Sequence, residues 1–200
     1  MSASEIQICN MGINMAGGLP ITSLTDTPGT VESRACNILF PLLRDELLAS
    51  HPWNFAMARA DISAQVAPSP AFGWDYAYTL PADCLRVWSL YNSDAEYEIE
   101  ADQLLTDQES EIYLVYIKQM TITGRFSPSF CTCLAVRIGA ELAIRTKNDQ
   151  TRRTALLTEL YQVHLPNAYR LNAEEGNRVI PKMSQSLDHG NYAWQTAGRG

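Results

Sequence analysis

The spacing of apolar residues changes twice along the chain, from a helical period to strand-like alternation and back to a helical period. Near the N-terminus, Ile6, Cys9 and Ile13 recur at helical spacing. Ser2 and Glu5 form a capping-box pattern, in which each side chain bonds the backbone N–H of the other residue. The pattern therefore predicts a short first helix that begins at Ser2.

A second, longer helix is predicted to begin at Thr27-Pro28, because a proline at the first helical position lacks an N–H that would have no helical partner there. Pro41 lies inside this helix and cannot bond the carbonyl of Asn37, so we expect a kink there. The pattern ends at His51-Pro52. The apolar positions form two adjoining stripes, Val31, Ala35, Ile38 and Leu42 with Leu39, Leu43 and Leu47.

Between residues 74 and 123 the sequence is typical of strands, because β-branched and aromatic residues are frequent and several stretches alternate. Trp74, Tyr76 and Tyr78 are expected on one face of the first strand. Ala101-Asp102 is predicted to form a tight hairpin. Further strands are predicted at residues 85–91, 97–100, 103–106 and 112–120.

Helical spacing returns at Ser127-Pro128, which repeats the N-cap and proline signature. The charged residues Arg137, Glu141 and Arg145 fall on one line of an otherwise apolar cylinder, which predicts a buried central helix. After a short turn a last helix follows, with a kink expected at Pro166 and a C-cap at Gly176. The apolar residues of the central helix recur every four positions, at Phe130, Leu134, Ile138 and Leu142.

This order of elements predicts an α+β protein. We expect a mainly helical bundle of about four helices, a small antiparallel β-rich insert domain and an extended C-terminal tail. Residues 1–73 and 127–176 form the two helical parts, 74–126 the insert and 177–200 the tail. The lack of alternating strands and helices argues against a doubly wound sheet.

Composition excludes several classes of protein. The 15 Lys and Arg residues are outnumbered by 22 Asp and Glu residues, and the net charge of −7 disfavours nonspecific binding to DNA. The five cysteines are an odd number and do not predict a disulfide framework. No apolar run is long enough to span a bilayer, and the first basic residue is Arg34, so no signal peptide is expected.

No pattern of catalytic, metal-binding or cofactor-binding residues is found in the sequence. Cys131 and Cys133 are two residues apart, which on a helix directs their thiols to opposite faces. A calcium loop beginning at Asn92 would need glycine and glutamate where Tyr97 and Gln103 stand. We therefore expect no catalytic site, no metal site and no cofactor.

Glu96, Glu98 and Glu100 occupy alternate positions in and just before the strand predicted at residues 97–100, in a run of alternating acids that also includes Asp94 and Asp102. If this segment is extended, the three acids share one face, and Tyr97 and Ile99 point inward. The simpler interpretation is a solvated strand face that also protects a sheet edge. The functional interpretation is an acidic channel face that repels a passing polyanion.

Four stretches, in this order and spacing, resemble one protein family. They are Ile8-Cys9-Asn10 with Ile21-Thr22-Ser23-Leu24, His51-Pro52-Trp53-Asn54-Phe55-Ala56, Tyr78-Thr79-Leu80-Pro81-Ala82-Asp83-Cys84-Leu85-Arg86-Val87, and Ser127-Pro128-Ser129-Phe130 leading into Leu134-Ala135 and Glu141-Leu142-Ala143. Over residues 5–175 the chain is similar to tail tubular protein A, the head-to-tail adaptor family of short-tailed (podovirus) bacteriophages. The resemblance implies a helical bundle that carries a small β-rich domain.

The resemblance also implies a structural virion protein without enzymatic activity. Such a protein is assembled in the host cytoplasm into the neck of the virion, as a homo-oligomeric ring of twelve copies. Its partners would be the portal protein and the tail nozzle protein, with double-stranded DNA passing through unbound and no membrane involved. In this family the C-terminal segment reaches toward the portal, which makes Leu187, Tyr192 and Trp194 the expected portal contacts.

Two other functions remain open from the sequence. A phage tail component with glycan-hydrolase activity would need two carboxylates roughly 5–10 Å apart across a groove. The 22 acidic residues do not single out such a pair. A nucleic-acid-binding module is the third possibility, and the net charge argues against it.

Overall fold

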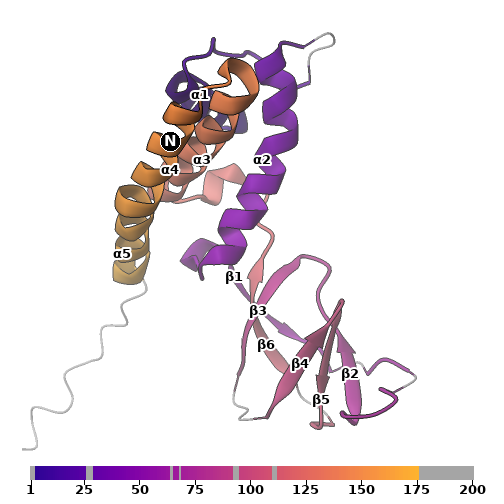
Figure 1. Ribbon diagram of the computed structural model, residues 1–200. Coiled ribbons are helices and arrows are strands. Elements are labelled where there is room, and N and C mark those ends of the chain that lie inside the picture. Colours follow the sequence, from indigo (N-terminus) through magenta and orange to yellow (C-terminus); the bar gives the residue numbers. More distant parts are fainter. Residues whose placement is uncertain are drawn as a thin grey trace, which may run out of the picture.

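The computed structural model describes residues 3–175, except for residues 26–28, 64, 68, 92–94, 110 and 111. Helices lie at one end of the molecule and strands at the other (Figure 1), so the fold is α+β as predicted. The predicted tail 177–200 and the predicted C-cap Gly176 lie outside the described residues. The helices are α1 (Glu5–Ala16), α2 (Val31–Ser50), α3 (Pro128–Lys147), α4 (Gln150–Glu159) and α5 (Leu165–Glu175).

The helices pack around α3, which contacts α1, α2, α4 and α5. Phe130, Leu134 and Ile138 of α3 are fully buried, as the apolar spacing predicts for a central helix. The arrangement is not the helical-bundle core expected from the sequence. Its helices are unequal, because α1 has 12 residues and α3 has 20, so α1 covers only part of α3.

The first two helices begin later than the sequence patterns predict. Ser4 caps α1, and its hydroxyl accepts from the N–H of Gln7 while the Gln7 side chain accepts from the N–H of Ser4. The capping box predicted at Ser2 and Glu5 is therefore wrong by two positions. Thr30, rather than Thr27, caps α2.

The two prolines within helices behave differently. Helix α2 stays helical from Val31 to Ser50 with Pro41 inside it. Before Pro166, the chain widens into a π-helical turn, Leu160–His164, between α4 and α5. Pro166 lacks an N–H, and its ring crowds the carbonyl of Gln162 four residues earlier, so a wider turn relieves the conflict. The irregularity expected at Pro166 therefore takes the form of this π turn.

Helices α1 and α3 cross at two glycines. A Cβ on Gly12 would lie 2.7 Å from the carbonyl oxygen of Ala135, and one on Gly139 would lie 2.9 Å from the carbonyl oxygen of Gly12. Both distances are too short for a carbon atom beside backbone. The absence of a side chain at these positions allows the two helices to approach this closely.

Gly139→Ala is therefore expected to lower the free energy of unfolding by about 1–3 kcal/mol through overpacking. A decrease in stability is diagnostic of overpacking, because alanine at an unhindered helix position is more favourable than glycine by about 1 kcal/mol. Urea denaturation followed by circular dichroism measures the change, with the exposed Thr154→Ala as control. A more stable Gly139→Ala protein would contradict the close helix crossing.

The strands form two three-stranded antiparallel sheets. Sheet A has the order β1-β6-β3 and sheet B the order β2-β5-β4. The sheets share a small core to which Tyr78 and Leu104 of sheet B and Leu114 and Tyr116 of sheet A belong. The strands are β1 (Met57–Asp61), β2 (Tyr76–Thr79), β3 (Cys84–Leu90), β4 (Tyr97–Glu100), β5 (Gln103–Thr106) and β6 (Tyr113–Lys118).

Two features of the β region differ from the sequence prediction. Strand β1 lies inside residues 1–73, which the pattern assigns to helix, and it pairs with β6. Tyr97 and Ile99 lie on the inner face of sheet B as predicted, opposite the buried Thr106 and Leu104, but their side chains stay 36% and 41% exposed. They alternate as predicted, yet β4 is the edge strand of sheet B and all four of its residues are exposed.

Candidate assembly surfaces

The described residues contain no group of three or more His, Cys, Asp and Glu side chains that could hold a metal ion. Cys131 and Cys133 are both buried in the core, and burial raises the pKa of Cys133 to about 11. This thiol therefore stays protonated at neutral pH. Within the same part of the chain, no helix is long and apolar enough to cross a membrane.

The motif at residues 51–56 links α2 to α5. Asn172 of α5 accepts from the N–H of Asn54 at 2.8 Å through Oδ1, and its Nδ2 donates to the carbonyl oxygen of Pro52 at 3.2 Å. These bonds determine the orientation of the Asn172 amide, so its Nδ2 also faces Nε2 of His51, 3.2 Å away. His51 Nε2 is then an acceptor, which requires the neutral ring.

The ring of His51 stacks on Tyr169, with centroids 4.1 Å apart. The His51 side chain therefore contacts α5. The indole N–H of Trp53 donates to the Leu47 carbonyl near the end of α2 at 2.9 Å. The motif therefore acts as a structural clamp.

Burial lowers the pKa of His51 below its usual 6.5. The unfolded chain binds this proton more readily than the folded chain, so the contribution to stability is complete above pH 6.5 and is lost as the pH falls below it. We expect the free energy of unfolding to decrease between pH 7 and pH 5. Denaturation across this range should show a weaker dependence in His51→Gln, and an unchanged dependence would contradict the clamp.

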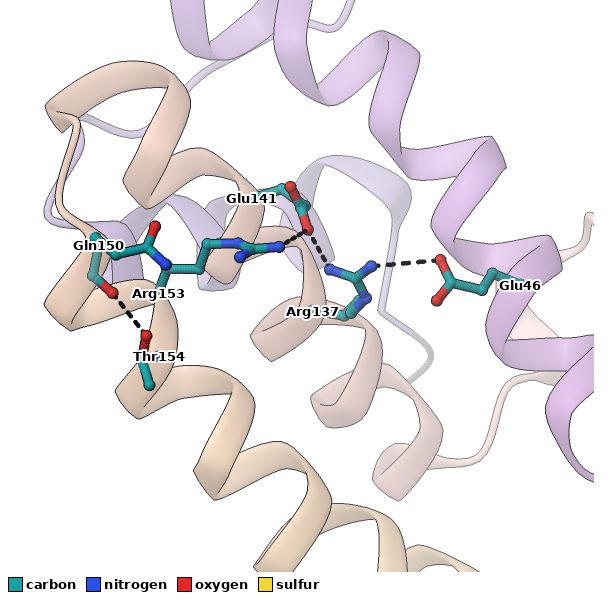
Figure 2. Close-up of polar contacts among 6 residues, drawn as sticks. All are labelled: Glu46, Arg137, Glu141, Gln150, Arg153 and Thr154. Carbon is teal, nitrogen blue, oxygen red and sulfur yellow. Dashed lines mark hydrogen bonds and ion pairs between the residues drawn. The ribbon is translucent and has the colours of Figure 1, made fainter.

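A charge network joins helices α2, α3 and α4 (Figure 2). Glu141 lies between Arg137 of α3 and Arg153 of α4, and Arg137 also approaches Glu46 of α2 at 3.5 Å. Burial alone would raise the pKa of Glu141, but its contacts with the two arginines outweigh burial and lower it. The predicted charged line of α3 is therefore a structural link between helices.

The outward face of sheet A carries aromatic and arginine side chains. Arg59 lies over the ring of Tyr91, 5.2 Å from its centroid, and Arg86 lies 5.8 Å from the centroid of Trp88. Tyr91 and Tyr113 line a shallow hollow of about 320 Å³ together with Arg59. We call this surface the aromatic–arginine face and define it by Arg59, Arg86, Trp88, Tyr91 and Tyr113. Such side chains are enriched in protein interfaces.

The acidic strand is on the opposite sheet. Glu96, Glu98 and Glu100 are exposed, and β4 forms the outer edge of sheet B. Glu98 accepts from the indole N–H of Trp74 at 3.1 Å, and Glu98 and Glu100 line a second hollow of about 320 Å³. Their exposure fits a solvated strand face at a sheet edge, and their role as an acidic channel face stays a prediction.

Apolar side chains also remain uncovered along α2. Val31, Ile38 and Leu42 are between 53% and 62% exposed, on the face that points away from α3. Three exposed apolar residues at helical spacing are typical of a contact with another protein. The predicted portal contacts, Leu187, Tyr192 and Trp194, lie outside the described residues.

Comparison with known proteins adds no family assignment. The function is therefore argued from the surfaces described above and from the motifs of the sequence. No protein-family model matches the chain, and no curated protein matches it significantly.

Proposed function

We propose that the protein is a structural virion component, a head-to-tail adaptor that forms a ring of twelve copies in the neck of a short-tailed phage. The ring joins the portal protein to the tail nozzle protein and surrounds the channel through which double-stranded DNA leaves. Assembly takes place in the host cytoplasm, and the protein has no enzymatic role.

The observation that carries this proposal is the role of the family-like motifs in the structure. Asn10 bonds both backbone groups of Ile21, at 2.9 and 2.8 Å, and so holds the segment after α1. Asp83 accepts from Tyr116 and pairs with Lys118 of β6. Together with the Asn172 clamp, these contacts stabilise a scaffold, as expected of motifs in a structural protein. An α+β fold with separate helical and β regions also agrees with the resemblance.

The net charge supports a conduit for DNA. Each copy carries −7, so a ring of the predicted twelve has a formal charge of 12 × (−7) = −84. Such a wall attracts no DNA backbone at physiological salt, and DNA can pass without being retained.

The test is reconstitution with the portal protein encoded in the same phage genome. We expect electron microscopy of the mixture to show a closed ring of adaptor copies below the portal, which imposes its symmetry on the contact between copies. The free protein is expected to be monomeric at micromolar concentration. A portal complex that carries one copy, or a compact dimer, would contradict the proposal.

The predicted tail gives a separate test of portal binding. Truncation after Asn177 is expected to leave the fold intact, because α5 ends at Glu175. Portal affinity should fall tenfold or more, and Tyr192→Ala with Trp194→Ala should reproduce much of that loss. Surface plasmon resonance on immobilised portal measures the effect. Unchanged affinity would show that the tail has no docking role.

A glycan-hydrolase function is the alternative, and one observation favours it. Glu98 and Glu100 lie two positions apart on β4, which places their Cα atoms about 6.6 Å from each other, and both line the hollow beside Trp74. Cα atoms at this spacing allow the two carboxyl groups to come within the roughly 5–10 Å that glycoside hydrolysis requires. Hydrolysis of host cell-surface glycan that is lost in Glu98→Gln and Glu100→Gln would establish this activity.

A further inference from the structure

The two sheets of the β region expose opposite charges. On the aromatic–arginine face, Arg59 and Arg86 form no ion pair with any described residue, although Arg86 donates to the Ala49 carbonyl oxygen at 3.2 Å. Glu98 and Glu100 of β4, and Glu96 just before it, also have no ion pair in the described part of the chain, although Glu98 accepts from Trp74. These charges are therefore not neutralised within one copy and can pair with a second molecule.

The shapes of the two surfaces are also complementary. The aromatic–arginine face has a hollow of about 320 Å³ between Arg59, Tyr91 and Tyr113. Strand β4 has a free edge, along which the exposed Tyr97 and Ile99 side chains lie on one face of the sheet and the glutamates on the other. An apolar residue that fills a hollow, surrounded by paired charges, is the usual arrangement at the centre of a protein interface.

One copy cannot bring these two surfaces together. The sheets share the core between them, so the outer face of sheet A points away from sheet B, and the two sheets lie side by side in Figure 1. A contact between two different patches on identical molecules is head-to-tail, and such contacts close into rings when the rotation allows it.

We propose that the occupant of the aromatic–arginine face is β4 of a second copy of this chain. Strand β4 docks by its free edge, so that Tyr97 and Ile99 on one side of the edge enter the hollow of the neighbour and the glutamates on the other side pair with Arg59 and Arg86. This inference rests on the proposed function, because it assigns the contact between neighbouring copies of the ring. It places the acidic strand between copies rather than along the DNA channel.

Charge reversal tests the contact. The face-reversed variant carries Arg59→Glu and Arg86→Glu, and the edge-reversed variant carries Glu98→Lys and Glu100→Lys. Sedimentation velocity is measured at millimolar-range protein and about 10 mM salt, where charge interactions reach about 30 Å. We expect the wild type to associate in a salt-sensitive manner, and each variant alone to associate at least tenfold more weakly.

The decisive sample is the equimolar mixture of the two variants. When the two variants alternate, the Glu residues of each reversed face meet the Lys residues of a reversed edge, and each unchanged Arg face meets an unchanged Glu edge. Association should therefore return to the wild-type level. The control is Arg34→Glu with Lys147→Glu, which makes the same change in net charge as the face-reversed variant, but on the exposed surface of the helices. This control should associate like the wild type.

Two further variants protect the test against misfolding. The single substitutions Arg59→Glu and Glu100→Lys remove no hydrogen bond or ion pair found in the structure. Each of these two variants should associate more weakly than the wild type, and their equimolar mixture should associate more strongly than either variant alone. A monomeric wild type, variants that associate like the wild type, or a mixture without recovery would each overturn the inference. The outcome of the portal experiment is independent of this test, because it depends on portal binding and not on charge reversal in the free protein.

Discussion

Replacing Trp53 by alanine is expected to lower the free energy of unfolding by about 3–5 kcal/mol. The Trp53 side chain is fully buried, and its ring contacts Phe130 edge-on with centroids 5.1 Å apart. It also contacts Phe55 and Tyr169, so it joins α3, α5 and the segment after α2. The substitution leaves a large cavity where these elements meet. Urea denaturation followed by circular dichroism measures the change.

A matched variant distinguishes the contribution of the aromatic ring to stability from that of the indole N–H. Trp53→Phe keeps an aromatic ring but removes the N–H that donates to the Leu47 carbonyl. The loss should be smaller, about 1–3 kcal/mol, because an acceptor is left without its partner and less volume is removed. Equal stability of the alanine and phenylalanine variants would show that the aromatic cluster contributes little.

Replacing Glu141 by leucine is the second change with a large expected effect. It leaves the guanidinium of Arg137, whose side chain is 17% exposed, with only Glu46 at 3.5 Å. Nε of Arg137 already lacks a hydrogen-bond partner among the described residues. Removing one member of a buried ion pair costs about 3–5 kcal/mol, and the partial exposure here reduces the expected loss to about 2–3 kcal/mol.

The double variant Arg137→Leu with Glu141→Leu is the control for this prediction. Replacing both charges by apolar side chains removes the unpaired charge, so most of the lost stability should return. Thermal denaturation of the single and double variants gives the coupling. A double variant less stable than Glu141→Leu would show that the network stabilises the fold through more than charge pairing.

Local signals predicted the parts of the fold that depend on neighbouring residues. The N-cap Ser127 and the proline after it begin α3 as expected, because cap bonds span three residues. Strands β4 and β5 have the predicted bounds, and Ala101 in their hairpin adopts a left-handed φ of 52°. These features depend on contacts within one turn or one hairpin, which a short stretch of sequence contains.

Features that depend on distant residues could not be predicted in this way. Strand β1, with the sequence Met-Ala-Arg-Ala-Asp, has little alternation, and its strand structure comes from pairing with β6 more than fifty residues away. The exposure of Tyr97 and Ile99 follows from the position of β4 at a sheet edge. The sequence shows the order of polar and apolar residues, but not which strand lies outermost.

The candidate surfaces differ in the same respect. Glu96 and the two glutamates of β4 were visible in the sequence, because they occupy alternate positions. The aromatic–arginine face was missed, since its residues come from β1, β3, β6 and the residue after β3. Only the pairing of β1 and β3 with β6 brings Arg59 beside Tyr91, which is 32 positions later in the chain.

The π turn between α4 and α5 makes the length of this exposed segment critical. A π turn holds one residue more than an α-helical turn, and this residue is absorbed within the turn, so the helix faces before and after it keep their register. The chain therefore accommodates the ring of Pro166 while Tyr169 and Asn172 of α5 still reach His51 and Asn54. A residue inserted after the turn is not absorbed, and it would rotate every later side chain by about 100°, away from these partners. The length of a segment that contacts little thus sets the register of a distant clamp, and insertions between the π turn and Tyr169 should be far less tolerated than substitutions.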